Sequence, residues 1–285
     1  MGANLILPAG SAAAADSTPA DPVTRSLRYP SGSYQSFTPS SGSSDFKKWV
    51  FSCWVKRCTT GVTFPLLQTA SGTSAPYNIT TIHFDANDNL EIGKYTNSYQ
   101  FRRLTTRVFR DPSAWMCVTV AYDSTQANEV DRIKIYINGE HDTNQTSSAS
   151  VDLNEASTFG TIGQVMRLNS FVHSASNDLG KSYQADVYFI DGSVTLPTGY
   201  SDWGSVFVED TGYGSVKPRD TSSILSSSDF GTNGFHLKFD DSSDIGADDA
   251  GSNDFTVTNL SSHDVMLDTP TKNYAVLNAL DIKNT

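Results

Sequence analysis

Apolar and polar residues alternate along several stretches of this chain with the two-residue period of a β-strand. The clearest stretch is KKWVFSCWVKR at 47–57, where Trp49, Phe51, Cys53 and Val55 fall on one face. No window longer than two turns shows the 3.6-residue period of an amphipathic helix. The pattern therefore predicts a chain built mainly from strands.

Two hairpins are predicted from neighbouring strands and the turns that join or end them. IHFDANDNLEIG at 82–93 reads as strand, turn and strand, with an Asn-Asp-Asn tip that tolerates positive φ. WMCVTVAYD at 115–123 pairs with RIKIYINGE at 132–140, whose isoleucines point inward and whose Asn-Gly ends the strand. Further strands are predicted at STFGTIGQV (157–165) and SYQADVYFIDG (182–192).

The spacing of these strands predicts an all-β fold, and a two-sheet antiparallel jelly-roll sandwich suits residues 25–193 best. The composition of the 285 residues agrees, because a low hydrophobic fraction (38%) and few charged residues (18%) leave room for turn-forming Ser, Thr, Asn and Gly. Residues 1–24 are predicted to form an extended N-terminal arm that orders against a partner. Residues 194–285 are predicted to form a loop-rich C-terminal strap or the start of a further β region, and we favour the strap.

The net charge of −11 and a pI near 4.7 argue against nucleic acid as a partner, since phosphate neutralisation needs clustered Lys and Arg. The densest basic run, FRRLTTRVFR at 101–110, is interpreted as a solvated strand edge. Cys53, Cys58 and Cys117 match no disulfide framework or zinc spacing and are interpreted as reduced thiols.

No apolar run is long enough to span a bilayer, so we expect no membrane insertion. The first residues, MGANLILPAGSAAAADSTPADP, lack the basic start of a signal peptide, and the simplest expectation is function without Sec export. The sequons at Asn78, Asn144 and Asn259 are then coincidental.

The ordered set FSCWVKR, HFDANDNLEIG, WMCVTVAYD, IKIYINGE and DVYFIDG resembles the concanavalin A-like, laminin-G-like sandwich over about 25–193. Members of that family typically carry a Trp-x-x-Val-x-Val-x-Tyr-Asp strand and a Tyr-Ile-Asn-Gly hairpin. Met116 departs from the family, where many relatives have His after the Trp. We expect no functional cost, because the position is structural.

A narrower resemblance covers roughly 185–278. DVYFIDGSVTLPTGY, followed after a poorly matched insert at 203–228 by GTNGFHLKFDDSSDIGADDAGSNDF and the residues beyond, is similar to a segment of large virion proteins of tailed, especially marine, phages. The resemblance implies a virion-surface protein, a tail fibre or spike, and a chain that is part of something longer.

The acidic stretch DDSSDIGADDAGSNDF at 240–255 raises the question of calcium. An EF-hand pattern fails in either frame, but laminin-G-like relatives sometimes hold calcium at a sandwich rim. The candidate ligands are Asp240, Asp244, Asp248 and Asn253. The alternative, which we favour, is a loop whose side chains cap backbone groups.

Catalysis is not expected. The Glu-x-Asp-x-x-Glu arrangement of sandwich glycosidases is absent, and the acidic pairs Glu129/Asp131 and Glu140/Asp142 lie at predicted hairpin ends. No Gly-x-Ser-x-Gly elbow, phosphate loop or paired metal-binding His motif occurs. The histidines are interpreted as structural residues: His83, His141, His173, His236 and His263.

A glycan site on a sandwich combines an exposed aromatic ring with Asp or Asn side chains from rim loops. The candidates for such a site are Tyr77, Asn78, Tyr95, Tyr99, Tyr200 and Trp203. Trp49, Trp54 and Trp115 are expected in the core.

The sequence as a whole favours a non-enzymatic phage virion protein, a tail fibre or spike component attached to a tail adaptor or tail tube through its N-terminal arm. It would take part in host adsorption by avidity, with a homotrimer as the expected assembly. A glycan-binding lectin module is the first alternative, and a capsid decoration or head-fibre protein is the second. Calcium is the single cofactor considered.

Overall fold

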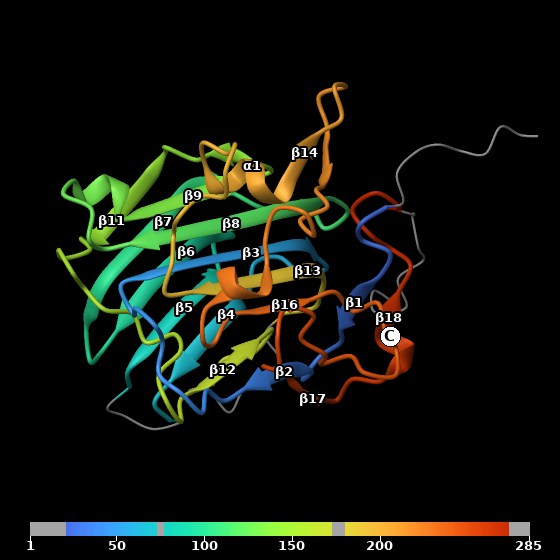
Figure 1. Cartoon of the computed structure of the whole chain (residues 1–285), viewed down its shortest axis with the longest axis horizontal. Helices are drawn as coiled ribbons and strands as arrows, with labels where there is room; N and C mark the ends of the chain where they lie inside the picture. The colour runs from blue at the N-terminus through green and yellow to red at the C-terminus, as the bar shows by residue number, and fades with distance from the viewer. Residues whose placement is uncertain (1–20, 73–76, 173–179, 274–285) are drawn as a thin grey trace, which may run out of the picture.

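A computed structural model describes residues 21–72, 77–172 and 180–273, which form two large antiparallel sheets (Figure 1). Sheet A has the order β10 (Glu140–His141), β9 (Ile133–Ile137), β8 (Trp115–Asp123), β3 (Lys48–Arg57), β13 (Ser182–Asp191), β1 (Ser26–Tyr29) and β18 (Val265–Met266), and β16 (Phe235–Leu237) also pairs with β13. Sheet B has the order β11 (Gln145–Ala149), β7 (Tyr99–Val108), β6 (Asn89–Tyr95), β5 (Ile79–Phe84), β4 (Phe64–Ala70), β12 (Val165–Leu168), β2 (Tyr34–Phe37) and β17 (Thr256–Thr258). The all-β sandwich expected from the sequence is confirmed.

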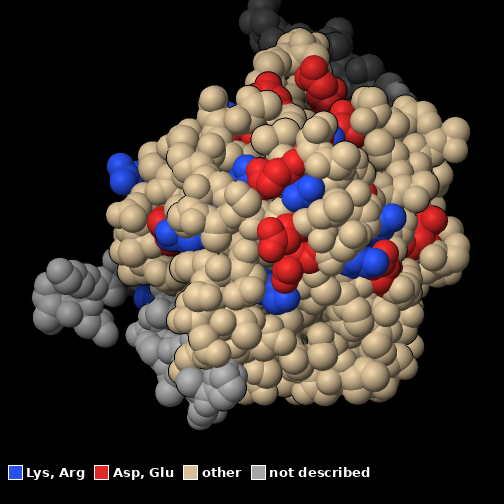
Figure 2. Space-filling model, turned by 90° about the vertical axis from the view of Figure 1, so that its left-hand side faces the viewer, with Lys and Arg blue, Asp and Glu red and all other residues tan. Residues whose placement is uncertain are grey.

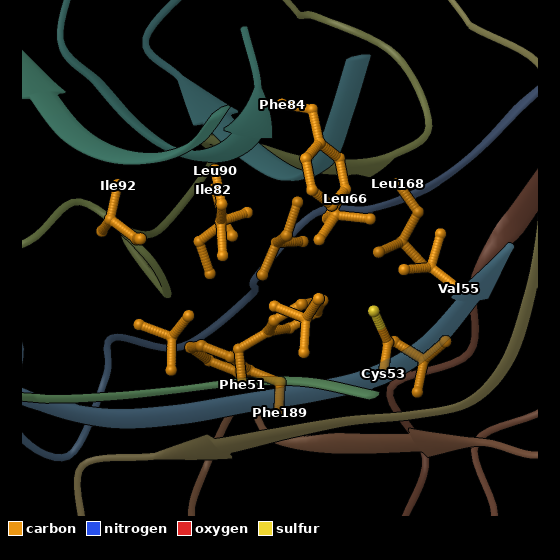
Figure 3. Close-up of a cluster of buried hydrophobic side chains, with 14 of the residues drawn as sticks. Phe51, Cys53, Val55, Leu66, Ile82, Phe84, Leu90, Ile92, Leu168 and Phe189 are labelled. Carbon is orange, nitrogen blue, oxygen red and sulfur yellow. The ribbon is translucent and has the colours of Figure 1, made fainter. Parts of the chain in front are cut away.

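The main core lies between the two sheets, where side chains at alternate strand positions meet. Figure 3 shows Phe51, Cys53 and Phe189 of sheet A facing Ile82 and Leu90 of sheet B. All five side chains are fully buried. Burial of a large apolar side chain contributes roughly 1.5–3 kcal/mol, so this layer supplies most of the driving force for folding.

The outer face of sheet A is also buried, because the C-terminal segment packs over it. Val50 and Trp54, on the second face of β3, contact a cluster that includes Trp203 and Phe207 of the short helix α1 (Trp203–Phe207). The same segment adds β16 and β18 to sheet A and β17 to sheet B, and it forms a small hairpin from β14 (Val208–Asp210) and β15 (Val216–Pro218). It is therefore a covering layer joined to both sheets by strand pairing.

Both predicted hairpins are confirmed. In β5 and β6, Ile82 lies opposite Ile92, and Asp88 at the tip has a φ of 70°. In β8 and β9, Val120 lies opposite Ile135, and the Asn-Gly after β9 has positive φ at both residues. These are the backbone values that Asn, Asp and Gly tolerate best. The predicted core positions of Trp49, Trp54 and Trp115 are confirmed as well, since all three are buried.

Two expectations about local structure were wrong. STFGTIGQV forms turns and not a strand, because Gly160 and Gly163 adopt positive φ, and β12 begins only at Val165. The basic run 101–110 is not a solvated edge either, since most of it forms β7, which is paired with β6 and β11.

The arginines of this run are paired individually. Arg102 contacts Glu91 at 2.7 Å, Arg103 contacts Glu129 at 2.5 Å, and Arg110 contacts Asp88 at 3.0 Å. Acidic and basic side chains are likewise interspersed on the face seen in Figure 2. No basic patch gathers on that face.

The helical content is small. Besides α1, the described residues contain short 3-10 turns, η1 (Glu129–Asp131), η2 (Ser227–Phe230) and η3 (Ser262–Asp264). Within those residues, no helix has the length and apolar character that a membrane crossing requires. The three cysteines are free thiols, and burial raises the pKa of Cys117 to about 12. That thiol is therefore protonated and unreactive at neutral pH.

Candidate functional site

A pocket of about 270 Å³ opens on sheet B, on the face turned away from the main core. Strand alternation creates it, because Ile82 and Phe84 of β5 point into the core, whereas Thr81 and His83, which alternate with them, point outward. Residues from β4, β6 and β7 and from the loops beside them complete the pocket. The full lining is Gln68, Tyr77, Ile79, Thr81, His83, Gly93, Tyr95, Tyr99 and Phe171.

The walls of the pocket are aromatic. Tyr95 and Tyr99 meet edge to face, with ring centroids 5.4 Å apart, and His83 and Phe171 do the same at 5.8 Å. Tyr99 is 42% exposed, so part of its ring is available to a ligand. Aromatic faces of this kind stack on the C–H faces of sugar rings, which bury apolar surface while their hydroxyls stay hydrogen-bonded.

A charged pair lies beneath the aromatic wall. Glu91 is buried, and its Oε2 accepts a hydrogen bond from Arg102 at 2.7 Å and lies 3.8 Å from His83 Nε2. The Arg102 guanidinium also lies under the Tyr99 ring, 5.0 Å from its centroid. The hydrogen bond to Glu91 raises the pKa of Arg102, and burial together with the Glu91 charge raises the pKa of Tyr99. Tyr99 therefore stays a neutral hydroxyl that can donate or accept.

The structure brings together three of the residues predicted for glycan binding: Tyr77, Tyr95 and Tyr99. Asn78 does not line the pocket. It lies beside it, and its Oδ1 accepts a hydrogen bond from Thr96 Oγ1 at 3.2 Å. Sequence reasoning missed the other six lining residues: Gln68, Ile79, Thr81, His83, Gly93 and Phe171. Alternation along β5 could have placed Thr81 and His83 on one face, whereas the others depend on strand register and loop position.

The remaining two predicted glycan residues lie elsewhere, in the layer over sheet A. Tyr200 and Trp203 line a separate pocket of about 410 Å³. Trp203 is only 5% exposed, donates its indole N–H to the Val194 carbonyl, and stacks on Phe207 at 5.9 Å. Its ring is therefore used mainly for packing.

The acidic stretch is organised by backbone hydrogen bonds. Asp248 is buried, and its two oxygens accept hydrogen bonds from the N–H groups of His236, Ala250 and Asn253. Asn253 in turn donates to the Gly234 carbonyl at 2.8 Å. These contacts match the alternative that we favour from the sequence, a loop whose side chains cap backbone groups.

The four candidate calcium ligands are not gathered into one site. Asp240 and Asp244 are exposed. Asp248 accepts a hydrogen bond from the backbone N–H of Asn253, whose side chain instead donates to the Thr232 and Gly234 carbonyls. Among the residues that the structure describes, no group of three or more His, Cys, Asp or Glu side chains is placed to hold a metal ion.

Replacing Asp248 with Asn is expected to destabilise the protein by about 1–3 kcal/mol, because the amide cannot accept as many backbone hydrogen bonds as the carboxylate. Thermal unfolding of the variant and the original chain, each in EDTA and in calcium, checks this. We expect the same loss of Tm in both buffers. A loss seen only with calcium present would mean that Asp248 is a calcium ligand.

Several of the other acidic and histidine candidates have structural partners. Glu129 is bound by Arg103, and Asp131 lies 3.4 Å from Lys134. His236 Nε2 and Asp186 Oδ1 are hydrogen-bonded at 2.7 Å, and the His236 ring stacks on the Tyr188 ring. His173 lies outside the described residues.

The family of the chain follows from its sequence. A family model described as the concanavalin A-like lectin/glucanases superfamily matches residues 31–174, just over half of the chain. The chain belongs to this superfamily. The match covers the strands from β2 to β12, including all those that form the pocket on sheet B. No curated protein sequence matches the chain.

Solved structures resemble this superfamily member in fold. A putative carbohydrate binding protein from Bacteroides ovatus aligns over 82% of this chain and 58% of its own, with a TM-score of 0.54 and 11% identity. A heptameric SAP-like pentraxin from Limulus polyphemus aligns over 62% of this chain and 80% of its own, with a TM-score of 0.42 and 12% identity. The sialidase CBM40 of Ruminococcus gnavus, bound to α2,3 sialyllactose, aligns over 54% of this chain and 92% of its own, with a TM-score of 0.36 and 12% identity.

Proposed function

We propose that this protein binds glycans, without catalysis, through the pocket on sheet B. The observation that carries the proposal is the meeting of Tyr77, Tyr95 and Tyr99 around a hollow that polar side chains such as Thr81 and Gln68 also line. Its volume of about 270 Å³ lies just below the usual range of small-molecule pockets, about 300–1,000 Å³. A single sugar ring at the end of a glycan therefore suits it better than a long chain.

Two further facts support the proposal. The Bacteroides ovatus neighbour is itself named as a putative carbohydrate binding protein. The pocket also lies on sheet B, whereas the outer face of sheet A is covered by the C-terminal segment. The outer face of sheet B therefore has a pocket for a ligand, whereas the outer face of sheet A is buried and contributes to stability.

The test is binding of the full chain to a panel of immobilised glycans, followed by titration with the free oligosaccharide that binds best. We expect a Kd between millimolar and micromolar. Tyr95→Ala and Tyr99→Ala should each weaken binding about tenfold, which corresponds to about 1.4 kcal/mol. Tyr213→Ala is the matched control, because Tyr213 is 94% exposed and lies outside the pocket. A chain that binds no glycan, or variants that bind as well as the original chain, would contradict the proposal, and release of reducing sugar would contradict the absence of catalysis.

We further propose that glycan binding serves a tailed phage during host adsorption, with this chain as part of a tail fibre or spike. The support is the resemblance of residues 185–278 to a segment of phage virion proteins. The arm at 1–24, which lies mostly outside the described residues, would attach the chain to a tail adaptor or tail tube, and avidity in a homotrimer would add to weak single-site affinity. A capsid decoration or head-fibre protein is the alternative location.

Deletion of residues 1–22 in such a phage, followed by electron microscopy and an adsorption assay, separates these locations. Loss of a tail appendage together with loss of adsorption is the expected result. Normal tails with normal adsorption would move the protein to the capsid surface.

A further inference from the structure

We propose that Gly93 and Glu91 set the ligand class of the pocket: it binds a neutral sugar ring that lies over Gly93 and donates a hydroxyl hydrogen bond to Glu91 Oε1. This inference rests on the proposed glycan-binding function and makes it specific. It is carried by two features of β6 that the fold itself does not require.

The first feature is a glycine in the interior of a paired strand. Gly93 lies between Thr81 of β5 and Arg102 of β7, where glycine is less favourable than alanine. Its φ is not in the left-handed region, and an added Cβ would lie 3.4 Å from its nearest neighbours, an ordinary contact distance. The backbone therefore does not need glycine here. In the structure the Tyr99 ring lies against this position, and we attribute the glycine to the close approach of a ligand once that ring is displaced.

The second feature is a buried carboxylate oxygen without a hydrogen bond. Glu91 is 1% exposed, and within the described part of the chain its Oε1 has no partner in hydrogen-bond geometry, although the carboxylate also interacts with the Tyr99 hydroxyl. An unsatisfied buried polar atom is destabilising, and a hydrogen-bond donor from a ligand would remove that penalty. The Cβ position at Gly93 is 3.5 Å from this oxygen, so the space left by the missing side chain leads to it.

Tyr99 controls access to that space. Its Cε1 lies 3.4 Å from the same Cβ position, so its ring shields Glu91 Oε1 from solvent. Tyr99 is 42% exposed and its side chain contacts Tyr95, Arg102 and Glu91, so a ligand would have to displace the ring from these contacts to reach the oxygen. A sugar would then stack on the displaced ring and place one hydroxyl over Gly93.

The charge of Glu91 selects against acidic sugars. The nearest guanidinium, that of Arg102, is already bound to Glu91 at 2.7 Å. A sugar carboxylate over Gly93 would therefore face the carboxylate of Glu91, and like charges in such contact disfavour binding by several kcal/mol. A neutral pyranoside supplies the hydroxyl donor without that repulsion.

The experiment compares two matched ligands, methyl β-glucoside and methyl β-glucuronide, with methyl β-galactoside and its galacturonide as a second pair. Each pair differs at C6, where a hydroxymethyl group becomes a carboxylate. Titration of the full chain followed by NMR or calorimetry should show the neutral member of at least one pair binding at least tenfold more tightly.

Three variants complete the test. Gly93→Ala should weaken binding of the neutral sugar at least tenfold while Tm is unchanged or slightly higher. Gly42→Ala, where an added Cβ has no neighbour nearer than 3.9 Å and φ is ordinary, should bind like the original chain. Glu91→Gln should weaken the neutral sugar and reduce the preference over the acidic one.

The possible results distinguish a failure of this inference from a failure of the proposed glycan-binding function. Equal or tighter binding of the acidic sugars, or normal binding by Gly93→Ala, would overturn the inference and leave glycan binding intact. Absence of binding for the monosaccharide pairs, when a larger glycan binds in the panel, would also overturn it. If the panel and the monosaccharides all fail to bind, the proposed function fails as well.

Discussion

Replacing Asp88 with Asn is expected to lower the free energy of unfolding by about 3–5 kcal/mol, because the change leaves a buried guanidinium without its counter-charge. Arg57 is completely buried at the end of β3, 4.5 Å from the Phe84 ring centroid. Its Nη2 contacts Asp88 Oδ1 at 2.9 Å, and its Nη1 donates to the Phe109 carbonyl at 2.6 Å. Asn suits the positive φ at this position, so the variant tests charge and not backbone strain.

The pH dependence of this effect has a defined sign. Burial alone would raise the pKa of Asp88, but the Gly61 N–H and the guanidinium groups of Arg110 and Arg57 outweigh it and lower the pKa below the usual 3.8. The stabilisation is therefore fully present above pH 3.8 and is lost as pH falls through the lower value in the folded protein.

Urea unfolding of the original chain and of Asp88→Asn at several pH values measures both effects. The difference in stability should be constant from pH 7 to about pH 4 and should shrink at lower pH. Asp152→Asn, at an exposed position, is the control and should change stability by no more than about 0.5 kcal/mol. A loss below about 1 kcal/mol for Asp88→Asn would show that Arg57 does not depend on this partner.

Replacing Phe207 with Ala is expected to cost about 3–5 kcal/mol, as much as a substitution between the two sheets. Phe207 is 1% exposed in α1 and packs on Tyr188 of sheet A, with ring centroids 4.8 Å apart, and on Trp203 at 5.9 Å. Removing its ring opens a cavity in the layer that covers sheet A. Chemical unfolding followed by tryptophan fluorescence and circular dichroism measures the loss.

The shape of the transition is as informative as its midpoint. Because the C-terminal segment shares strand pairs with both sheets, we expect one cooperative transition that shifts as a whole. Tyr213→Ala in the same segment should change stability by no more than about 0.5 kcal/mol. A second, separate transition that alone responds to Phe207→Ala would mean that the C-terminal segment unfolds independently of the sandwich.

The strands that sequence reasoning located are those whose local pattern agrees with their tertiary position. β3, β8 and β9 alternate clearly, and the Asn-Gly after β9 has the backbone that those residues favour. The strands β16, β17 and β18 were not located, because each has only two or three residues and exists through pairing with distant strands. In 157–165, β-favouring Thr, Phe and Ile suggested a strand, but two glycines with positive φ impose turns.

Only part of the pocket was predicted, again because some of its residues can be recognised from the local sequence and others cannot. Tyr77, Tyr95 and Tyr99 lie close to the ends of the hairpin strands, and their chemistry alone marked them as candidates. Gly93 gave no signal as a single residue, because its meaning comes from the register that places it beside Thr81 and Arg102. Tyr200 and Trp203 have the same chemistry, but the fold buries the Trp203 ring of α1 in the layer that covers sheet A.

The most direct test of the central claim is a crystal structure of the full chain with the sugar that binds best in titration. We expect its ring to lie over Gly93, stacked on Tyr95 or Tyr99, with a hydroxyl within hydrogen-bond distance of Glu91. A sugar bound instead beside Tyr200 and Trp203, or ordered nowhere on sheet B despite saturating concentration, would contradict the assignment of this pocket as the glycan site.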